Sequence, residues 1–385
     1  MLLFKKTKMF LKNHMIALFV IAFFVIFALW LALYMKREVG KQPTEQQLQK
    51  FEKLPYFNDG RFFNYYKPID GFKNSNESEN ARYVSTFIMM KNLLFPKKVQ
   101  MQKANLTKNS FSIKPDDFAF YWFGHSTVLL ELSGKRIIID PVFGNASMIP
   151  FTVNRRTSAP VKVKDLPKID YVLITHNHYD HLERKTIQYL NKHNSIFIVP
   201  LGLYDTLIGW GVKGKHIIEL GWEDFYKIDD KLKITAEPAI HFSGRWLNDR
   251  NKTLWNSYVI QNDGRNIFCA GDGAYGEQID MMAKKYKKFE LAMIESDAWN
   301  VRWPYVHMFT RESIEIVKKL NVDFLLPVHW GVFNLAMHDF DTSIKMLQNE
   351  AKNSGIYNKL LLPALGEKVV LIKDEKKAIY NIKSV

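Results

Sequence analysis

Cysteine is almost absent from this chain of 385 residues. Cys269 is the only one, so no disulfide can form within the chain. Its apolar neighbours, Ile267, Phe268 and Ala270, are typical of a buried strand and predict a shielded, unreactive thiol. No repeat of short period is visible either, which argues against a repeat architecture.

Acidic residues are scarce relative to basic ones. The chain has 39 Asp and Glu against 54 Lys and Arg, which gives a formal net charge of +15. Such an excess either covers a solvated basic face or attracts anionic lipid or another polyanion. No RNA- or DNA-binding motif with interleaved aromatic residues accompanies this charge, so no nucleic-acid partner is expected. Hydrophobic residues make up 47% of the chain, which is enough for a substantial core.

Residues 15–35 carry no charged side chain and are apolar almost throughout. As a helix they would be about 31 Å long, which is enough to cross the hydrocarbon core of a bilayer. A cleaved signal peptide fits less well, because its apolar region is usually about 7–15 residues and a small-x-small cleavage site should follow. We therefore expect a retained, single-span membrane anchor.

Basic residues flank this span in nearly equal numbers on both sides. The positive-inside rule therefore separates the two orientations only weakly. The lysines before the span lie in a very short segment, which favours an N terminus inside the cell and a catalytic domain outside the cytoplasm.

Composition divides the chain into five parts. A polar linker follows the anchor, and an aromatic segment with a turn at Asn58–Gly60 leads into the main domain. The aromatic clusters of that segment either pack into the core or form a lip that faces lipid. The predicted parts are a basic segment (1–14), the anchor (15–35), the linker (36–53), an N-terminal cap packed on the catalytic domain (54–116) and the catalytic domain itself (117–385).

Short apolar runs separated by amphipathic segments predict an α/β fold built in layers. Strands are expected near residues 118–122, 128–132, 136–139, 171–175, 195–199, 215–220, 231–236, 255–260, 266–270, 291–294 and 324–328, and helices near 81–94, 183–192, 202–210 and 311–320. Several His and Asp residues fall at or after the ends of these strands, where functional sites usually form.

Residues 175–181 read Thr-His-Asn-His-Tyr-Asp-His and contain four side chains of metal-ligand type. Three of the chain's 11 histidines lie within six positions here, which a chance polar loop rarely shows. His176 and His178 are two residues apart and can converge on one ion, while Asp180 and His181 can turn to a neighbouring ion. Imidazole and carboxylate ligands suit zinc, and also manganese or iron. The segment therefore predicts a site for two divalent metal ions.

The order of motifs resembles the metallo-β-lactamase fold superfamily. It is most similar to the branch that contains N-acyl phosphatidylethanolamine-hydrolysing phospholipase D and its bacterial relatives. The likeness runs from about residue 54 to about residue 366. It is carried by Trp-Phe-Gly-His-Ser-Thr at 122–127, Ile-Asp-Pro at 139–141, residues 175–181, Val-Pro-Leu-Gly at 199–202, His241, Ala-Gly-Asp at 270–272, residues 303–307, and His-Trp-Gly at 329–331.

This resemblance implies an αββα four-layer sandwich, two β-sheets packed face to face with helices outside, preceded here by one transmembrane helix. It implies two divalent ions, expected to be Zn²⁺, with a bridging hydroxide as the nucleophile. One ion would be held by His176, His178 and His241, the other by Asp180, His181 and His329, and Asp272 would bridge the two. The plainer alternatives are a strand-end histidine at 241, a core histidine beside Trp330 at 329 and a turn residue at Asp272.

Further roles also follow from the resemblance. Asp180 and His181 count as catalytic through the ion they hold, and His125 and Asp140 would orient the ligand loop. His307 would face the substrate and protonate a leaving group or bind a phosphate oxygen. Its alternative is a capping or packing histidine.

The expected function is that of a membrane-anchored phosphodiesterase acting on phospholipid or another phosphodiester. Two departures from the resembled branch bear on the substrate: residues 271–275 lack a hydroxyl beside the bridging Asp, and residues 295–299 replace an apolar, Gly-containing stretch. One alternative is a lactonase or a hydrolase of small phosphodiesters. Others are a non-catalytic envelope protein with structural metals and, more weakly, a β-lactamase.

Overall fold

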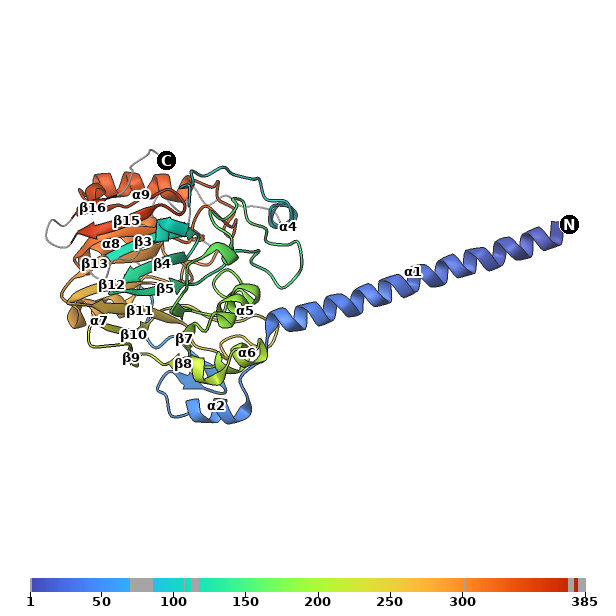
Figure 1. The fold of residues 1–385 in the computed structure, drawn as a ribbon, viewed down its shortest axis with the longest axis horizontal. Coiled ribbons are helices and arrows are strands. Elements are labelled where there is room, and N and C mark those ends of the chain that lie inside the picture. Colours follow the sequence, from blue (N-terminus) through green and yellow to red (C-terminus); the bar gives the residue numbers. More distant parts are fainter. Residues whose placement is uncertain are drawn as a thin grey trace.

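The computed structural model describes residues 2–69, 86–106, 108–111, 118–300, 302–372 and 377–379. Two β-sheets pack face to face, and a long helix projects from one side of the domain that they form (Figure 1). The predicted helix at 81–94 is described only from residue 86 onward, and the predicted boundary between residues 116 and 117 lies outside the described residues.

The larger sheet has eight strands in the order β16-β15-β3-β4-β5-β6-β7-β8. Its first half is antiparallel, but β5, β6, β7 and β8 run parallel to one another. The strands are β3 (Phe118–Gly124), β4 (Thr127–Leu132), β5 (Lys135–Ile139), β6 (Tyr171–Leu173), β7 (Ile196–Pro200), β8 (Ile217–Leu220), β15 (Lys368–Ile372) and β16 (Lys377–Ile379).

The smaller sheet has six strands in the order β14-β13-β12-β11-β10-β9. Here β12, β13 and β14 are parallel, whereas β9, β10, β11 and β12 alternate in direction. The strands are β9 (Phe225–Lys227), β10 (Leu232–Pro238), β11 (Asn256–Asn262), β12 (Arg265–Cys269), β13 (Phe289–Glu295) and β14 (Val322–Val328). A separate hairpin joins β1 (Phe57–Asn58) to β2 (Arg61–Phe62).

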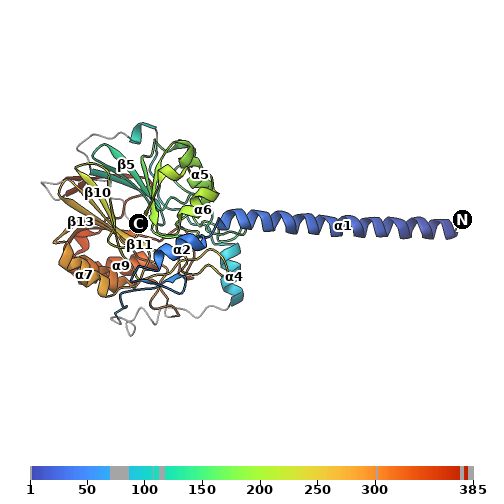
Figure 2. The same ribbon diagram turned by 90° about the horizontal axis from the view of Figure 1, so that it is seen from below.

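Helices cover the outer face of each sheet (Figure 2). On the larger sheet, Ile187 of α5 and Leu207 of α6 pack against Val172 and Phe197. On the smaller sheet, α8 packs on β13 and β14 and contacts α7 and α9 on its flanks. The helices of the domain are α4 (Thr86–Leu94), α5 (Arg184–Lys192), α6 (Tyr204–Gly209), α7 (Glu277–Lys285), α8 (Thr310–Lys319) and α9 (Thr342–Asn353).

The main core lies between the two sheets. Every second residue of β3 points into it, so that Phe118, Phe120 and Trp122 meet Tyr258 and Phe268 of the smaller sheet. The layer order is therefore helix, sheet, sheet, helix, which confirms the αββα sandwich that the motifs imply.

At the N-terminal end, α1 (Leu2–Val39) extends away from the domain as a single helix, and α2 (Glu45–Phe51) packs beside the hairpin. The segment His14–Val39 is long and apolar enough to cross a membrane, by length and composition. It is the one such helix among the described residues, and it contains the predicted span at residues 15–35.

Candidate metal centre

The side chains of metal-ligand type gather at one edge of the two sheets. Strands β5 and β6 are parallel, as are β12, β13 and β14, and β10 points the same way as β12. Within each sheet the carboxyl ends of these strands therefore lie at one edge. The close approach of the side chains that follow them brings the two edges together. Asp140, residues 176–181, His241, Asp272, Glu295 and His329 all end or follow these strands.

One group consists of three imidazoles. His176 Nε2 lies 2.8 Å from His178 Nδ1, and His241 Nε2 lies 3.3 Å from the same atom. Three ligand nitrogens this close to one another can take one ion between them.

A second group combines imidazoles with a carboxylate. Asp180 Oδ2 lies 3.2 Å from His329 Nε2 and 3.5 Å from His181 Nε2. Nitrogen and oxygen donors of this kind again suit a divalent ion.

Asp272 lies between the two groups. Its Oδ2 is 3.1 Å from His181 Nε2 and 3.0 Å from His329 Nε2 on one side, and 3.9 Å from His176 Nε2 and 4.0 Å from His241 Nε2 on the other. Its Oδ1 is buried and has no hydrogen-bond partner in the described part of the chain. A buried, unpaired carboxylate oxygen between two sets of imidazoles fits a position that bridges two cations.

Hydrogen bonds behind the ligands select which ring nitrogen faces inward. Asp140 Oδ2 lies 2.7 Å from His181 Nδ1, the Thr175 hydroxyl lies 3.0 Å from His176 Nδ1, and the Val306 carbonyl lies 3.1 Å from His241 Nδ1. Each contact occupies Nδ1 and leaves Nε2 directed at the cluster, which is how metal-binding histidines are usually oriented. Asp140 also accepts from the Thr175 backbone N–H at 2.8 Å and so fixes the start of the ligand loop.

His125 reaches the cluster directly, because its Nε2 lies 2.9 Å from Asp180 Oδ2. Its Nδ1 is buried without a partner among the described residues. His125 therefore contacts the Asp180 carboxylate and is close enough to join the second group. Its role in orienting the loop stays a prediction.

The protonation pattern follows from burial and mutual proximity. Burial, reinforced by neighbouring histidines, lowers the pKa of His176 and His241 well below the usual value, and burial lowers the pKa of His178 to about 4. These three imidazoles are therefore neutral near pH 7 and have a lone pair for a metal.

The second group behaves in the opposite way. Burial alone would lower the pKa of His329, but Asp272 and Asp180 raise it to about 10. The same carboxylates, with Asp140, raise the pKa of His181 well above its usual value against the effect of burial. Protonated His181 and His329 therefore balance the negative charge of the buried carboxylates, a role that a bound cation would otherwise take.

Sequence reasoning missed the part that Glu295 plays at this centre. Its buried carboxylate accepts hydrogen bonds from the Gly273 N–H at 2.8 Å and the Met308 N–H at 3.3 Å, and Oε2 lies 2.5 Å from His307 Nδ1. The His307 ring centroid lies 5.4 Å from that of His241 and 5.3 Å from that of His329. His307 therefore sits beside both ligand groups, and the departure at residues 295–299 was the available signal for its partner.

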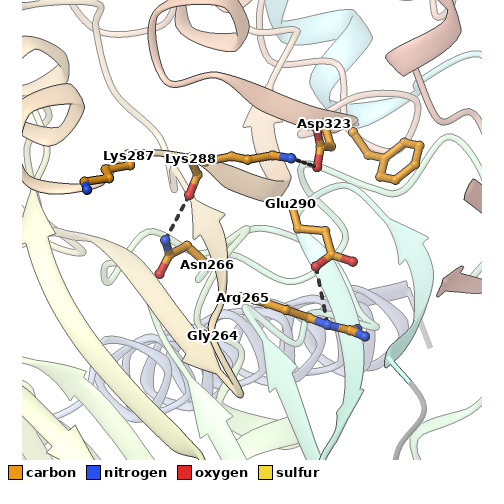
Figure 3. A pocket seen from close by; sticks show the side chains of 8 residues that line it. Gly264, Arg265, Asn266, Lys287, Lys288, Glu290 and Asp323 are labelled. Carbon is orange, nitrogen blue, oxygen red and sulfur yellow. Dashed lines mark hydrogen bonds and ion pairs between the residues drawn. The ribbon is translucent and has the colours of Figure 1, made fainter. Parts of the chain in front are cut away.

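A hollow of about 320 Å³ lies elsewhere, between the amino-terminal ends of β12, β13 and β14 (Figure 3). Arg265 pairs with Glu290 at 3.4 Å, and Lys288 pairs with Asp323 at 2.6 Å. Four charges of the wall are therefore paired with one another, and Lys287 also lines the hollow.

Comparison with known proteins identifies the family to which this domain is similar. Residues 135–330 match the family described as beta-lactamase superfamily domain. An uncharacterized protein of Mycobacterium tuberculosis is 35% identical over 251 residues, which cover 64% of this chain and 67% of the relative. N-acyl-phosphatidylethanolamine-hydrolyzing phospholipase D 1 of Caenorhabditis elegans is 30% identical over 249 residues, covering 61% of this chain and 70% of the relative.

Solved structures agree on the fold. An isothiocyanate hydrolase from Delia radicum gut bacteria has a TM-score of 0.54 at 22% identity, over 65% of this chain and 98% of its own. A metallo hydrolase from Ignicoccus hospitalis has a TM-score of 0.53 at 21% identity, over 67% and 100%. The family match and the similar sequences confirm the resemblance seen in the motifs, and the solved structures confirm its fold.

Proposed function

The chain belongs to the beta-lactamase superfamily, as a metal-dependent hydrolase related to N-acyl-phosphatidylethanolamine-hydrolyzing phospholipase D, and we propose that it is a membrane-anchored dizinc phosphodiesterase acting on phospholipid. The observation that carries this proposal is the convergence of His176, His178 and His241 on one side of Asp272, with Asp180, His181 and His329 on the other.

We assign the first three histidines to one ion, Asp180, His181 and His329 to the second, and Asp272 to both. When bound, a pair of divalent ions lowers the pKa of water towards neutrality and offsets the charge of a phosphodiester. Two carboxylates among seven ligands leave the loaded centre positive, which suits an anionic substrate.

His307 is the proposed proton donor to the leaving group, or a ligand of a phosphate oxygen. Glu295 holds His307 through Nδ1 and leaves Nε2 for the substrate. Burial would lower the pKa of His307, but Glu295 raises it, which favours the protonated ring. A held, protonated imidazole beside the ligands is the arrangement that general acid catalysis needs.

Phospholipid is favoured over other phosphodiesters for two reasons. The similar proteins of Caenorhabditis elegans and Saccharomyces cerevisiae are named as phospholipases D of N-acyl-phosphatidylethanolamine. The apolar part of α1 makes no buried contact with the domain over its most hydrophobic stretch, as expected of a helix that lies in lipid.

The test uses the full chain, loaded with Zn²⁺ in vesicles, and measures phosphodiester hydrolysis in a panel of phospholipids. We expect turnover that is lost in His178→Ala, with about two ions bound per wild-type chain and fewer in His329→Ala by elemental analysis. The matched control is His193→Ala, an exposed histidine at the end of α5, which should change neither value.

Three other outcomes would overturn the proposal. Turnover of a soluble lactone or small phosphodiester without any lipid hydrolysis would identify the small-substrate alternative. Two bound ions with no hydrolysis of any kind would favour a structural role for the metals. Hydrolysis that survives in His178→Ala would contradict the assigned site.

A further inference from the structure

We propose that the face of the domain from which α1 projects rests on the bilayer that α1 spans, with Trp246, Leu247 and Phe151 in contact with the lipid. The inference rests on the proposed anchoring by α1 and adds to it an interaction surface on the catalytic domain.

The end of α1 is fixed to the domain. The Arg37 carbonyl accepts a hydrogen bond from Trp210 Nε1 at 2.8 Å, and the Glu38 carboxylate pairs with Arg184 at 2.7 Å. Arg245 donates to the Glu38 carbonyl at 2.7 Å. Glu38 and Val39 are buried against the domain. The apolar run ends at Met35, about 4.5 Å along the helix before Glu38. The surface around Glu38 is therefore held at the membrane boundary and cannot swing away.

Two exposed apolar side chains follow Arg245 directly. Leu247 is 91% exposed and Trp246 is 40% exposed. Asp249 closes the loop that carries them by accepting hydrogen bonds from the backbone N–H groups of Arg245 and Trp246, at 3.0 and 2.9 Å. Gln42, just beyond α1, also donates to Asp249 at 2.9 Å. The loop therefore presents Leu247 and Trp246 in a fixed position beside the end of the anchor.

A second apolar group continues the same face. Phe151 is 81% exposed and Phe95, after α4, is 75% exposed. Asn154 joins them by donating to the carbonyls of Leu94 and Phe151, at 3.0 and 2.8 Å. In both ribbon views α4 lies on the side of the domain from which α1 projects (Figures 1 and 2).

Tyr179 links the two groups. Tyr179 and Val153, which lies two residues beyond Phe151, pack against the same buried cluster around Val332. The Tyr179 hydroxyl donates to the Arg245 carbonyl at 2.9 Å. Exposed aromatic and aliphatic side chains around a membrane-spanning helix, with Lys36 and Arg37 at its end, have the composition of a surface that enters the head-group region.

The same arginine connects this face to the metal centre. Arg245 Nη1 donates to the carbonyls of Asn177 and Leu182, at 2.7 and 3.0 Å, on either side of the ligands Asp180 and His181. Its guanidinium also lies 3.8 Å from the Tyr179 ring centroid. One buried side chain thus separates the end of the anchor from the ligand loop, which places the proposed catalytic centre close to the lipid head groups.

The experiment measures contact with lipid, independently of turnover. The full chain carries an environment-sensitive dye on Leu247→Cys or Phe151→Cys, in vesicles of phosphatidylcholine and phosphatidylglycerol with a nitroxide on the acyl chains. Cys269 is buried, and burial raises the pKa of its thiol, so it should not compete for the dye. The matched control is Phe225→Cys, a 60% exposed position on β9, on the side away from α1.

We expect the nitroxide to quench the dye at positions 247 and 151 at least several-fold more than at 225. Equal quenching at all three positions, or none at 247 and 151, would overturn the inference. A second arm compares Leu247→Asp with wild type on vesicle phospholipid and on a soluble phosphodiester.

That second arm separates this inference from the proposed function. Leu247→Asp should slow hydrolysis in vesicles several-fold and leave the soluble substrate unaffected, while Phe225→Asp should change neither. If no variant hydrolyses lipid but quenching at 247 and 151 persists, the phospholipid substrate fails and the membrane-contacting face stands. If lipid is hydrolysed without that quenching, the proposed function stands and the face fails.

Discussion

Three residues of the centre have strained backbone conformations. His125, Asp140 and His329 have φ angles of 52°, 41° and 66°, in the left-handed region that non-glycine residues rarely adopt. Each such residue costs about 1–3 kcal/mol and persists only where surrounding contacts enforce it. The side chains of His125 and His329 contact Asp180, and that of Asp140 contacts His181. The surrounding contacts therefore hold these conformations where they direct side chains into the proposed centre.

Substitution of Glu295 is the most specific single-residue test of the role proposed for His307. In Glu295→Gln the amide oxygen is needed by the Gly273 and Met308 N–H groups, so the NH₂ group faces His307 Nδ1 and donates where the carboxylate accepted. The imidazole therefore changes tautomer. We expect the turnover number to fall about 10–100-fold with bound metal unchanged. The ¹⁵N chemical shifts of His307 should report the altered tautomer, which a merely structural role for Glu295 would not produce.

Glu237→Gln is the matched control for this change. Glu237 is equally buried and pairs with Lys285 at 2.8 Å, but it lies within β10 and away from the ligands. It should cost stability and leave turnover per folded molecule unchanged. Equal losses of turnover in the two variants would show that Glu295 acts only through folding.

At the scale of elements, the sequence predicts where strands and helices lie better than it predicts which residues contact one another. The strands that end near residues 139, 174, 270 and 328 are recognisable as apolar runs, and the ligands follow them. The prediction omits α9, although Ile344, Leu347 and Ala351 recur on one face and were a usable signal. The contact of Arg245 with Glu38 joins residues 207 apart in sequence, and only the packed domain brings them together.

Asp297 connects the loop after β13 to α9 through hydrogen bonds. Its Oδ1 accepts from His338 Nδ1 at 2.8 Å and from the Ser343 hydroxyl, in the first turn of α9, at 2.7 Å. Burial opposes ionisation, but these partners lower the pKa of Asp297 to about 2, from an ordinary value of 3.8. The native state therefore favours the carboxylate, and that preference contributes stability above the unfolded-state pKa.

Asp297→Asn should lower the free energy of unfolding by about 2 kcal/mol at pH 7, as measured by urea denaturation in detergent. The difference from wild type should shrink as pH falls below about 4 and should be lost near pH 2, because the native carboxylate is then protonated as well. Asp280→Asn, which removes only the partly exposed ion pair with Lys319, is the control and should cost less than about 1 kcal/mol. A pH-independent loss in Asp297→Asn would contradict the assigned charge.

At the scale of the whole molecule, the centre joins the two sheets. His176, His178, Asp180 and His181 follow β6 of the larger sheet, whereas His241, Asp272 and His329 follow strands of the smaller one. Each proposed ion takes ligands from both sheets, so binding should stabilise their packing in addition to supplying chemistry. The sequence predicts which side chains would serve as ligands, and that assignment stays a prediction. It could not predict the cross-sheet connection, which depends on how the layers stack.

Removing the metal should therefore lower stability and change the number of bound protons. At a free ion concentration of about 1,000 times the dissociation constant, each site contributes about 4 kcal/mol, so a chelator should lower the melting temperature of the domain by many degrees. His181→Ala should melt lower than wild type before chelation and respond less to the chelator. An unchanged wild-type melting temperature after complete metal removal would contradict the cross-sheet role.

Metal binding to the group of Asp180, His181 and His329 should release protons to the solvent. Neighbouring carboxylates raise the pKa of His329 to about 10, so without metal the ring is protonated at pH 7 and must lose its proton to coordinate. Zn²⁺ uptake should therefore release protons, and the apparent affinity should fall as pH is lowered. Calorimetric titrations at pH 7 in two buffers of different ionisation enthalpy measure that release directly, and His329→Ala should release fewer protons than wild type. Equal heats in the two buffers would mean that His329 is not a ligand or is already neutral before the metal binds.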